Sequence, residues 1–189
     1  MKFYFDTEFL DDGHTIELIS IGIVNEAGQE YYAVNSEFDE GSATEWLQTR
    51  VLAHIPRDFK RKLHINIAQE VQAFLRCPDG AELWGWYPAY DWVALCQLYG
   101  PMVNRPRHFP KRANDLKQTL DALPPDSSFV LPRQTGTKHN ALEDAKWVKD
   151  AHTQYLVWKW ARDQRRYPIP SFGGSDSPLL NVPRGATGF

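Results

Sequence analysis

The chain has 189 residues, a net charge of −3 and hydrophobic residues at 42% of its positions. This length favours one domain with a sizeable core over two independent domains. The net charge gives no overall positive potential that would indicate nucleic-acid binding. The two cysteines, Cys77 and Cys96, exclude a disulfide framework and are typical of a reducing compartment, so we expect a cytoplasmic protein. Neither a signal peptide nor an apolar run of membrane-spanning length is evident, so we expect no membrane association.

The chain opens on an aromatic strand that carries two acids, from Phe3 to Phe9. Because successive side chains of a strand alternate between faces, Asp6 and Glu8 should project to one side together with Tyr4. Such neighbours lie about 6.6 Å apart along a strand, close enough for two carboxylates to bind one hard cation or a bridged pair. The alternative explanation for this pattern is an edge strand whose outer face is simply solvated.

Two further strands are expected after the first, which would complete a three-stranded meander. They cover residues 15–24 and 30–34, and turn signals precede both of them. A fourth strand, short and buried, is expected at residues 81–86.

Five helices are expected between and after these strands. Ser42 and Glu45 form a capping box that predicts the start of the first helix, and Asn66 can cap the second. The last helix is long and amphipathic and should pack on the sheet. The expected helices span residues 42–53, 66–77, 90–99, 115–123 and 140–165.

Four acids fall within or at the ends of these elements. Asp6 and Glu8 lie in the first strand, Asp91 starts the helix after the fourth strand, and Asp144 lies early in the last helix. Their combined charge matches two divalent cations, and carboxylate oxygens are the ligands that Mg²⁺ and Mn²⁺ prefer. Two such ions about 3.5–4 Å apart can activate a water and stabilise the leaving oxygen of a phosphodiester.

His139 lies five positions before Asp144. If both were on the helix, five steps of roughly 100° would place them about 140° apart, and they would not meet. If His139 instead belongs to the loop before the helix, it can reach the acids and act as a general base. The spacing therefore favours a loop histidine.

These residues occur in three short motifs, namely Asp6-Thr-Glu8, Asp91 within Ala-Tyr-Asp-Trp-Val-Ala-Leu, and His-Asn-Ala-Leu-Glu-Asp from His139 to Asp144. In order and separation they resemble the three exonuclease motifs of the DEDDh 3′–5′ exonucleases, over roughly residues 1–165. The resemblance implies an α/β, RNase H-like fold, with a mixed sheet and helices on both faces. It also implies two Mg²⁺ or Mn²⁺ ions bound by the four acids, His139 as the base for the attacking water, and a homodimer.

By the same resemblance, we expect the chain to hydrolyse phosphodiester bonds at the 3′ end of single-stranded RNA and to release 5′-mononucleotides. A DNA exonuclease of the proofreading or repair type is one alternative. A catalytically idle module that binds nucleic acid or a partner protein is the other, disfavoured because it has no physical reason to keep uncompensated acids together. The chain would then consist of an exonuclease domain at residues 1–166 and a Pro/Gly/Ser-rich tail at residues 167–189.

Four further residues are candidate substrate contacts. Many relatives have Gly or Thr after the first Glu, so Phe9 and Leu10 depart from the family pattern where the chain approaches the terminal ribose. Phe9 should lie either in the core or beneath the last base, and Trp92 either in the core or against a base. Lys138, beside His139, could contact a phosphate. Trp86 is expected in the core.

Other polar residues are expected to be structural or solvated. The basic, proline-containing segment Arg105–Arg112 could hold a nucleic-acid backbone, but a solvated loop is the favoured interpretation. Glu143 is expected to face solvent, and the other histidines have no partner at ligand spacing.

Overall fold

The computed structural model of the chain describes residues 1–166. The predicted tail at residues 167–189 lies outside the described residues, so its boundary stays a prediction. A five-stranded sheet of order β3-β2-β1-β4-β5 forms the centre of the domain. The strands are β1 (Lys2–Asp11), β2 (Ile16–Asn25), β3 (Glu30–Val34), β4 (Glu82–Gly85) and β5 (Ala113–Asp115).

The first three strands form the predicted antiparallel meander, and β4 pairs with β1 in parallel. The sheet is therefore mixed. The short β5, which pairs in parallel with β4, had no signal in the sequence because three residues are too few to show a period of two.

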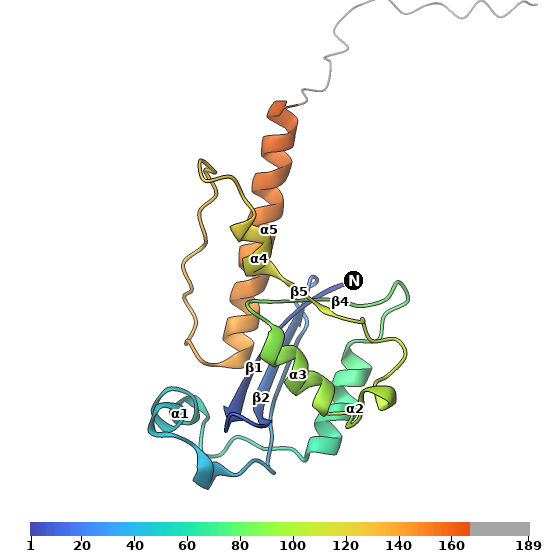
Figure 1. The fold of residues 1–189 in the computed structure, drawn as a ribbon, viewed down its shortest axis with the longest axis vertical. Helices are drawn as coiled ribbons and strands as arrows, with labels where there is room; N and C mark the ends of the chain where they lie inside the picture. The colour runs from blue at the N-terminus through green and yellow to red at the C-terminus, as the bar shows by residue number, and fades with distance from the viewer. Residues whose placement is uncertain (167–189) are drawn as a thin grey trace, which may run out of the picture.

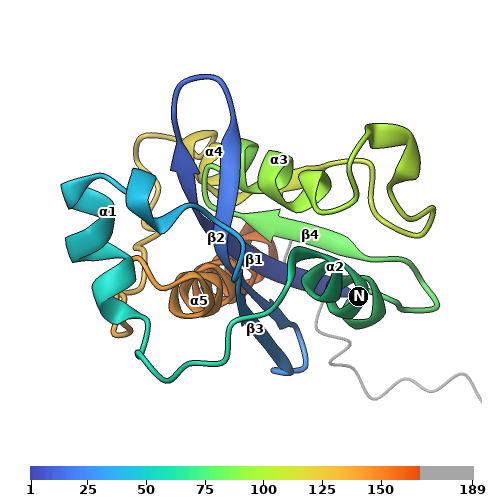
Figure 2. The same ribbon diagram turned by 90° about the horizontal axis from the view of Figure 1, so that it is seen from below.

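Helices cover both faces of this sheet, and β1 shows why. Phe3 and Phe5 are buried on one face, where they pack with α2 (His64–Phe74) and α3 (Ala89–Gln97). Tyr4 is buried on the other, with α4 (Leu116–Asp121) and α5 (Ala141–Arg166). Figures 1 and 2 show α5 on one side of β1 and β2, and α2 and α3 on the other. The alternation predicted for the first strand is confirmed.

The predicted cap of the first helix is wrong. This helix, α1, spans Glu45–Arg50 and lies between two short 3₁₀ helices, Glu40–Ser42 and Leu52–His54. Thr44 caps it by accepting a hydrogen bond from the Leu47 backbone N–H at 3.3 Å. The Ser42 hydroxyl instead donates to the Asp39 carboxylate. Thr44, rather than Ser42, therefore sets the start of α1.

The start of α2 also differs from the prediction. The helix begins at His64, and Asn66 lies inside it rather than capping it. The Glu37 carboxylate, 27 residues earlier, accepts a hydrogen bond from the His64 backbone N–H at 2.5 Å. A carboxylate from elsewhere in the chain thus satisfies one of the free donors at this helix end. Asp115 caps α4, because its carboxylate accepts a hydrogen bond from the Gln118 backbone N–H.

One glycine lets the N-terminal end of α5 approach the sheet closely. Gly22 on β2 pairs directly with Asp6 on β1. A side chain at this position would overlap the backbone of Ala141 and Leu142, where α5 begins. The close approach places the first turn of α5, with Asp144, beside the acidic end of β1.

A register shift follows in the β1–β2 ladder between Glu8 and Phe9, where β2 carries one extra residue, Ile19, without a partner on β1. Bulges of this kind often lie near active sites, where they redirect a side chain. Among the helices described, none has both the length and the apolar character needed to cross a lipid bilayer.

Candidate active site

The four acids and His139 line one open cavity of about 700 Å³. Asp6 and Glu8 come from β1, Asp91 from the first turn of α3, and Asp144 from the first turn of α5. The cavity therefore collects side chains from both faces of the sheet at one end of β1. Its volume lies within the range of about 300–1,000 Å³ that small-molecule sites occupy.

Thr7 fixes the position of Asp91. Asp91 Oδ1 accepts hydrogen bonds from the Thr7 backbone N–H at 2.8 Å and from Thr7 Oγ1 at 2.7 Å. Both residues are buried, with exposed fractions of 4% for Thr7 and 7% for Asp91. A buried pair of this kind holds the carboxylate in one orientation and leaves its second oxygen available for another partner.

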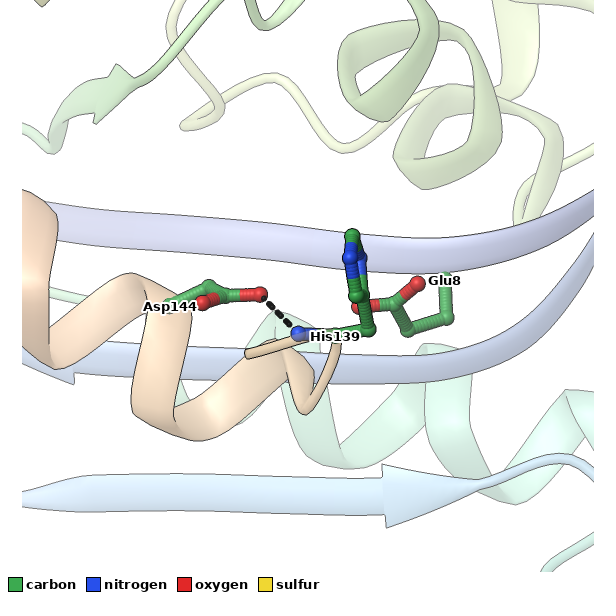
Figure 3. A group of neighbouring side chains, drawn as sticks. All are labelled: Glu8, His139 and Asp144. Atoms are coloured by element: carbon green, nitrogen blue, oxygen red, sulfur yellow. Dashed lines mark hydrogen bonds between the residues drawn. The ribbon is translucent and has the colours of Figure 1, made fainter. Parts of the chain in front are cut away.

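His139 lies in the loop before α5, as the spacing predicted, and this loop returns onto Asp144 (Figure 3). The His139 backbone N–H donates to Asp144 Oδ2 at 2.9 Å. The residue has a positive φ of 61°, which is uncommon for a residue other than glycine. Asp144 Oδ1 also accepts from the Gln134 side-chain amide, so both oxygens of this acid are oriented by the loop. Backbone strain of this sort is often found at functional sites.

Glu8, His139 and Asp144 could hold a metal ion. One possible ligand atom from each lies within 4.8 Å of the others. In Figure 3 the Glu8 carboxylate lies beside the His139 ring. Among the side chains that the structure describes, those of residues 1–164, no lysine or arginine forms an ion pair with Asp6, Glu8, Asp91 or Asp144. Partly buried, uncompensated carboxylates are costly, and they fit a divalent cation that prefers oxygen ligands.

The acids raise one another's pKa. Loss of hydration is the largest cause of the raised pKa of Asp6, and the negative charges of Asp91, Glu8 and Asp144 add to it. Burial raises the pKa of Glu8 to about 8, with further contributions from Asp144 and Asp91. Each of these carboxylates would ionise more readily beside a bound cation.

Local hydrogen bonds oppose this effect at the other two acids. Burial raises the pKa of Asp91, but the two bonds from Thr7 lower it. Burial likewise raises the pKa of Asp144, while the Gln134 amide and the His139 N–H lower it. These donors stabilise the charged forms, which are the forms that bind metal.

Two of the four predicted substrate contacts line the cavity. Phe9 is partly buried and stacks on Tyr90, with ring centroids 5.8 Å apart and an angle of 10° between the planes. Lys138 is exposed at the cavity wall. Phe9 therefore lies neither fully in the core nor free, and it forms part of the cavity wall.

The structure does not bring the other two predicted contacts, Leu10 and Trp92, to this cavity. Leu10 is 8% exposed and packs in a second core cluster beneath α1, with Ile19, Val34 and Val51. Trp92 packs against the main core, and the Arg105 guanidinium lies 5.2 Å from the centre of its ring. Both side chains have structural contacts instead.

Several lining residues had no signal in the sequence. Trp86, expected in the core, is partly buried, packs edge-to-face on Trp147 at 4.8 Å and also lines the cavity. Arg133 and Gln134 reach the cavity from the polar segment before α5. No local pattern distinguishes such loop residues, because only the return of the loop onto Asp144 brings them here.

Comparison with known proteins identifies the family of the chain. The family model described as the Rv2179c-like 3′-5′ exoribonuclease domain matches residues 1–156. The chain belongs to this family. Two family relatives named 3′-5′ exoribonuclease, Rv2179c and MT2234.1 from two strains of Mycobacterium tuberculosis, are each 43% identical over 150 residues. Each match covers 77% of this chain and 88% of the relative.

The fold has a known counterpart as well. Schizosaccharomyces pombe Pop2p, solved with Mg²⁺ and Mn²⁺ bound, matches with a TM-score of 0.54 and 14% identity. The match covers 88% of this chain and 83% of that one. At this identity the likeness concerns the fold alone, and it confirms the predicted RNase H-like class.

Proposed function

We propose that the chain hydrolyses single-stranded RNA from its 3′ end and releases 5′-mononucleotides. In this proposal Asp6, Glu8, Asp91 and Asp144 hold two Mg²⁺ or Mn²⁺ ions, and His139 is the general base. The observation that carries the proposal is the meeting of all five side chains in one cavity. Membership of a 3′-5′ exoribonuclease family supports both the direction of attack and the choice of RNA.

The four acids supply the ligand set, and Thr7 keeps Asp91 in place. When bound, the two cations would polarise the phosphate and stabilise the negative charge that develops on the attacking and leaving oxygens. The chain's own contribution is to fix the ligands and to shape a cavity that admits a strand end.

His139 would accept the proton of the attacking water. Attack forms a new bond from the water oxygen to phosphorus, and the bond between phosphorus and the 3′ oxygen of the preceding nucleotide breaks. The terminal nucleotide leaves with a 5′-phosphate. The hydrogen bond from the His139 backbone keeps this residue next to Asp144, and a ring nitrogen of His139 lies within 4.8 Å of carboxylate oxygens of Glu8 and Asp144.

A digestion assay tests this proposal. RNA labelled at its 5′ end should be shortened to a ladder with Mg²⁺ or Mn²⁺, and EDTA should abolish the ladder. The Asp144→Asn and Asp6→Ala variants should lose at least 100-fold in rate. Asp150→Asn is the matched control, because Asp150 lies on the same helix and is exposed to solvent. A wild-type chain that leaves RNA intact with either metal would overturn the proposal.

The same assay addresses the nature of the nucleic acid. Labelled DNA of the same sequence should be degraded more slowly than RNA. Equal or faster digestion of DNA would favour a DNA exonuclease, and binding without digestion would favour the idle module. The predicted homodimer is a separate proposal, and light scattering of the purified chain tests it by giving the mass in solution.

A further inference from the structure

The ring of His139 has an aromatic neighbour from a distant part of the chain. Trp46, on α1, packs edge-to-face against His139, with ring centroids 4.9 Å apart and an angle of 75° between the planes. In Figures 1 and 2, α1 lies beside the loop that leads into α5. The contact therefore joins the segment after β3 to the loop that carries the proposed base.

The backbone and the ring of His139 are held by different partners. The hydrogen bond to Asp144 and the positive φ fix the backbone. Among residues 1–166, no hydrogen bond involves the ring nitrogens of His139. The ring is instead in contact with the ring of Trp46. Without that contact the imidazole could rotate about its side-chain torsions while the backbone stayed in place.

Contacts at both ends hold α1, the helix that carries Trp46. Thr44 caps α1, and Val51, directly after the helix, is 1% exposed in the second core cluster. Leu10, at the end of the acidic strand, belongs to the same cluster. The end of the strand that carries the acids and the segments on either side of α1 therefore belong to one core cluster, against which Leu47 of α1 packs.

We propose that Trp46 is a positioning residue for His139, which holds the imidazole toward the acids in the orientation that accepts a proton. The inference rests on the proposed function, because it assigns Trp46 a role only through the base. The Trp46 ring is 52% exposed, so its removal opens no cavity in the core. Loss of one aromatic pair corresponds to about a 3- to 10-fold change in the population of the productive orientation.

The test measures single-turnover RNA cleavage with saturating Mn²⁺ by the full chain. Trp46→Ala should lower the maximal rate about 3- to 10-fold and leave the half-saturating RNA concentration within twofold of wild type. Trp46→Phe, which keeps an aromatic ring, should restore most of the rate, and Trp46→Leu should not. Trp160→Ala, which removes a 65% exposed tryptophan far along α5, is the control and should be unchanged.

A double substitution separates this role from RNA binding. In a His139→Ala chain, which retains only residual activity, adding Trp46→Ala should cause no further loss, because Trp46 acts through the missing ring. The same loss in both backgrounds, or a raised half-saturating RNA concentration, would overturn the positioning role. Equal rates for Trp46→Leu and Trp46→Phe would also overturn it. An inactive wild-type chain would instead count against the proposed function itself.

Discussion

Replacing Gly22 by alanine should separate Asp144 from the acids of the first strand. Gly22 pairs with Asp6, and its φ is not positive, so alanine suits the backbone conformation at this position. The effect is therefore steric alone. The new methyl group would meet the backbone of Ala141 and Leu142 well inside the 3.0 Å that real Cβ contacts keep.

The expected loss of stability and activity in Gly22→Ala follows from the displacement of α5. The obstacle is helix backbone, which cannot rotate away as a side chain could, so the start of α5 has to retreat from β2 by roughly 1 Å. Overpacking of this kind costs about 1–3 kcal/mol of unfolding free energy. A displacement of about 1 Å at a catalytic group can cost about 100-fold in rate, and Asp144 lies in the first turn of α5.

Urea denaturation and single-turnover RNA cleavage measure the two effects. We expect Gly22→Ala to unfold at lower urea and to cleave about 100-fold more slowly when fully folded. Gly41→Ala is the control, because a methyl group there would meet only the exposed Asp39 carboxylate, at 3.2 Å. A Gly22→Ala chain with wild-type stability and rate would refute the argument that this glycine sets the position of α5.

Three other changes have definite expected outcomes. Thr7→Val removes one of two donors to Asp91, so about 10-fold more Mg²⁺ should be needed for half-maximal cleavage, whereas Thr7→Ser should behave as wild type. Burial lowers the pKa of His152 from 6.5 to about 4, so the unfolded chain takes up this proton first as the pH falls. The free energy of unfolding, measured by urea denaturation, should therefore fall by up to about 3 kcal/mol as the pH is lowered from 6.5 to 4. His152→Gln should remove that dependence, and an unchanged slope would contradict it. Burial raises the pKa of Glu8 from 4.5 to about 8, so the metal-free chain should lose stability as the pH rises from 4.5 to 8. Mn²⁺ should therefore raise the melting temperature more at pH 8 than at pH 6. An equal rise at both pH values would count against metal binding by Glu8.

The two faces of the central strand and the loop position of His139 could be predicted from sequence, because local patterns determine them. The alternation of Phe3, Tyr4 and Phe5 indicated the two faces of β1, and the separation of five positions from His139 to Asp144 indicated a histidine in the loop. These inferences use only the period of a strand and the pitch of a helix.

The start of α2 and the outer cavity wall could not be predicted, because distant contacts determine them. Glu37 decides where α2 begins, and the return of the loop before α5 brings Gln134 to Asp144. Leu10 is two positions after Glu8, yet it packs in the core cluster beneath α1, whose other residues come from β2, β3 and the segments around α1. Trp46 meets His139 only because α1 packs at the same end of the sheet.

Anomalous diffraction from a Mn²⁺-soaked crystal tests the central claim most directly. We predict two manganese peaks in the cavity, about 3.5–4 Å apart, with carboxylate oxygens of Asp6, Glu8, Asp91 and Asp144 at ligand distance. Asp144→Asn should weaken or remove at least one of the peaks. A cavity without manganese at saturating concentration, or peaks that do not touch these four acids, would contradict the account.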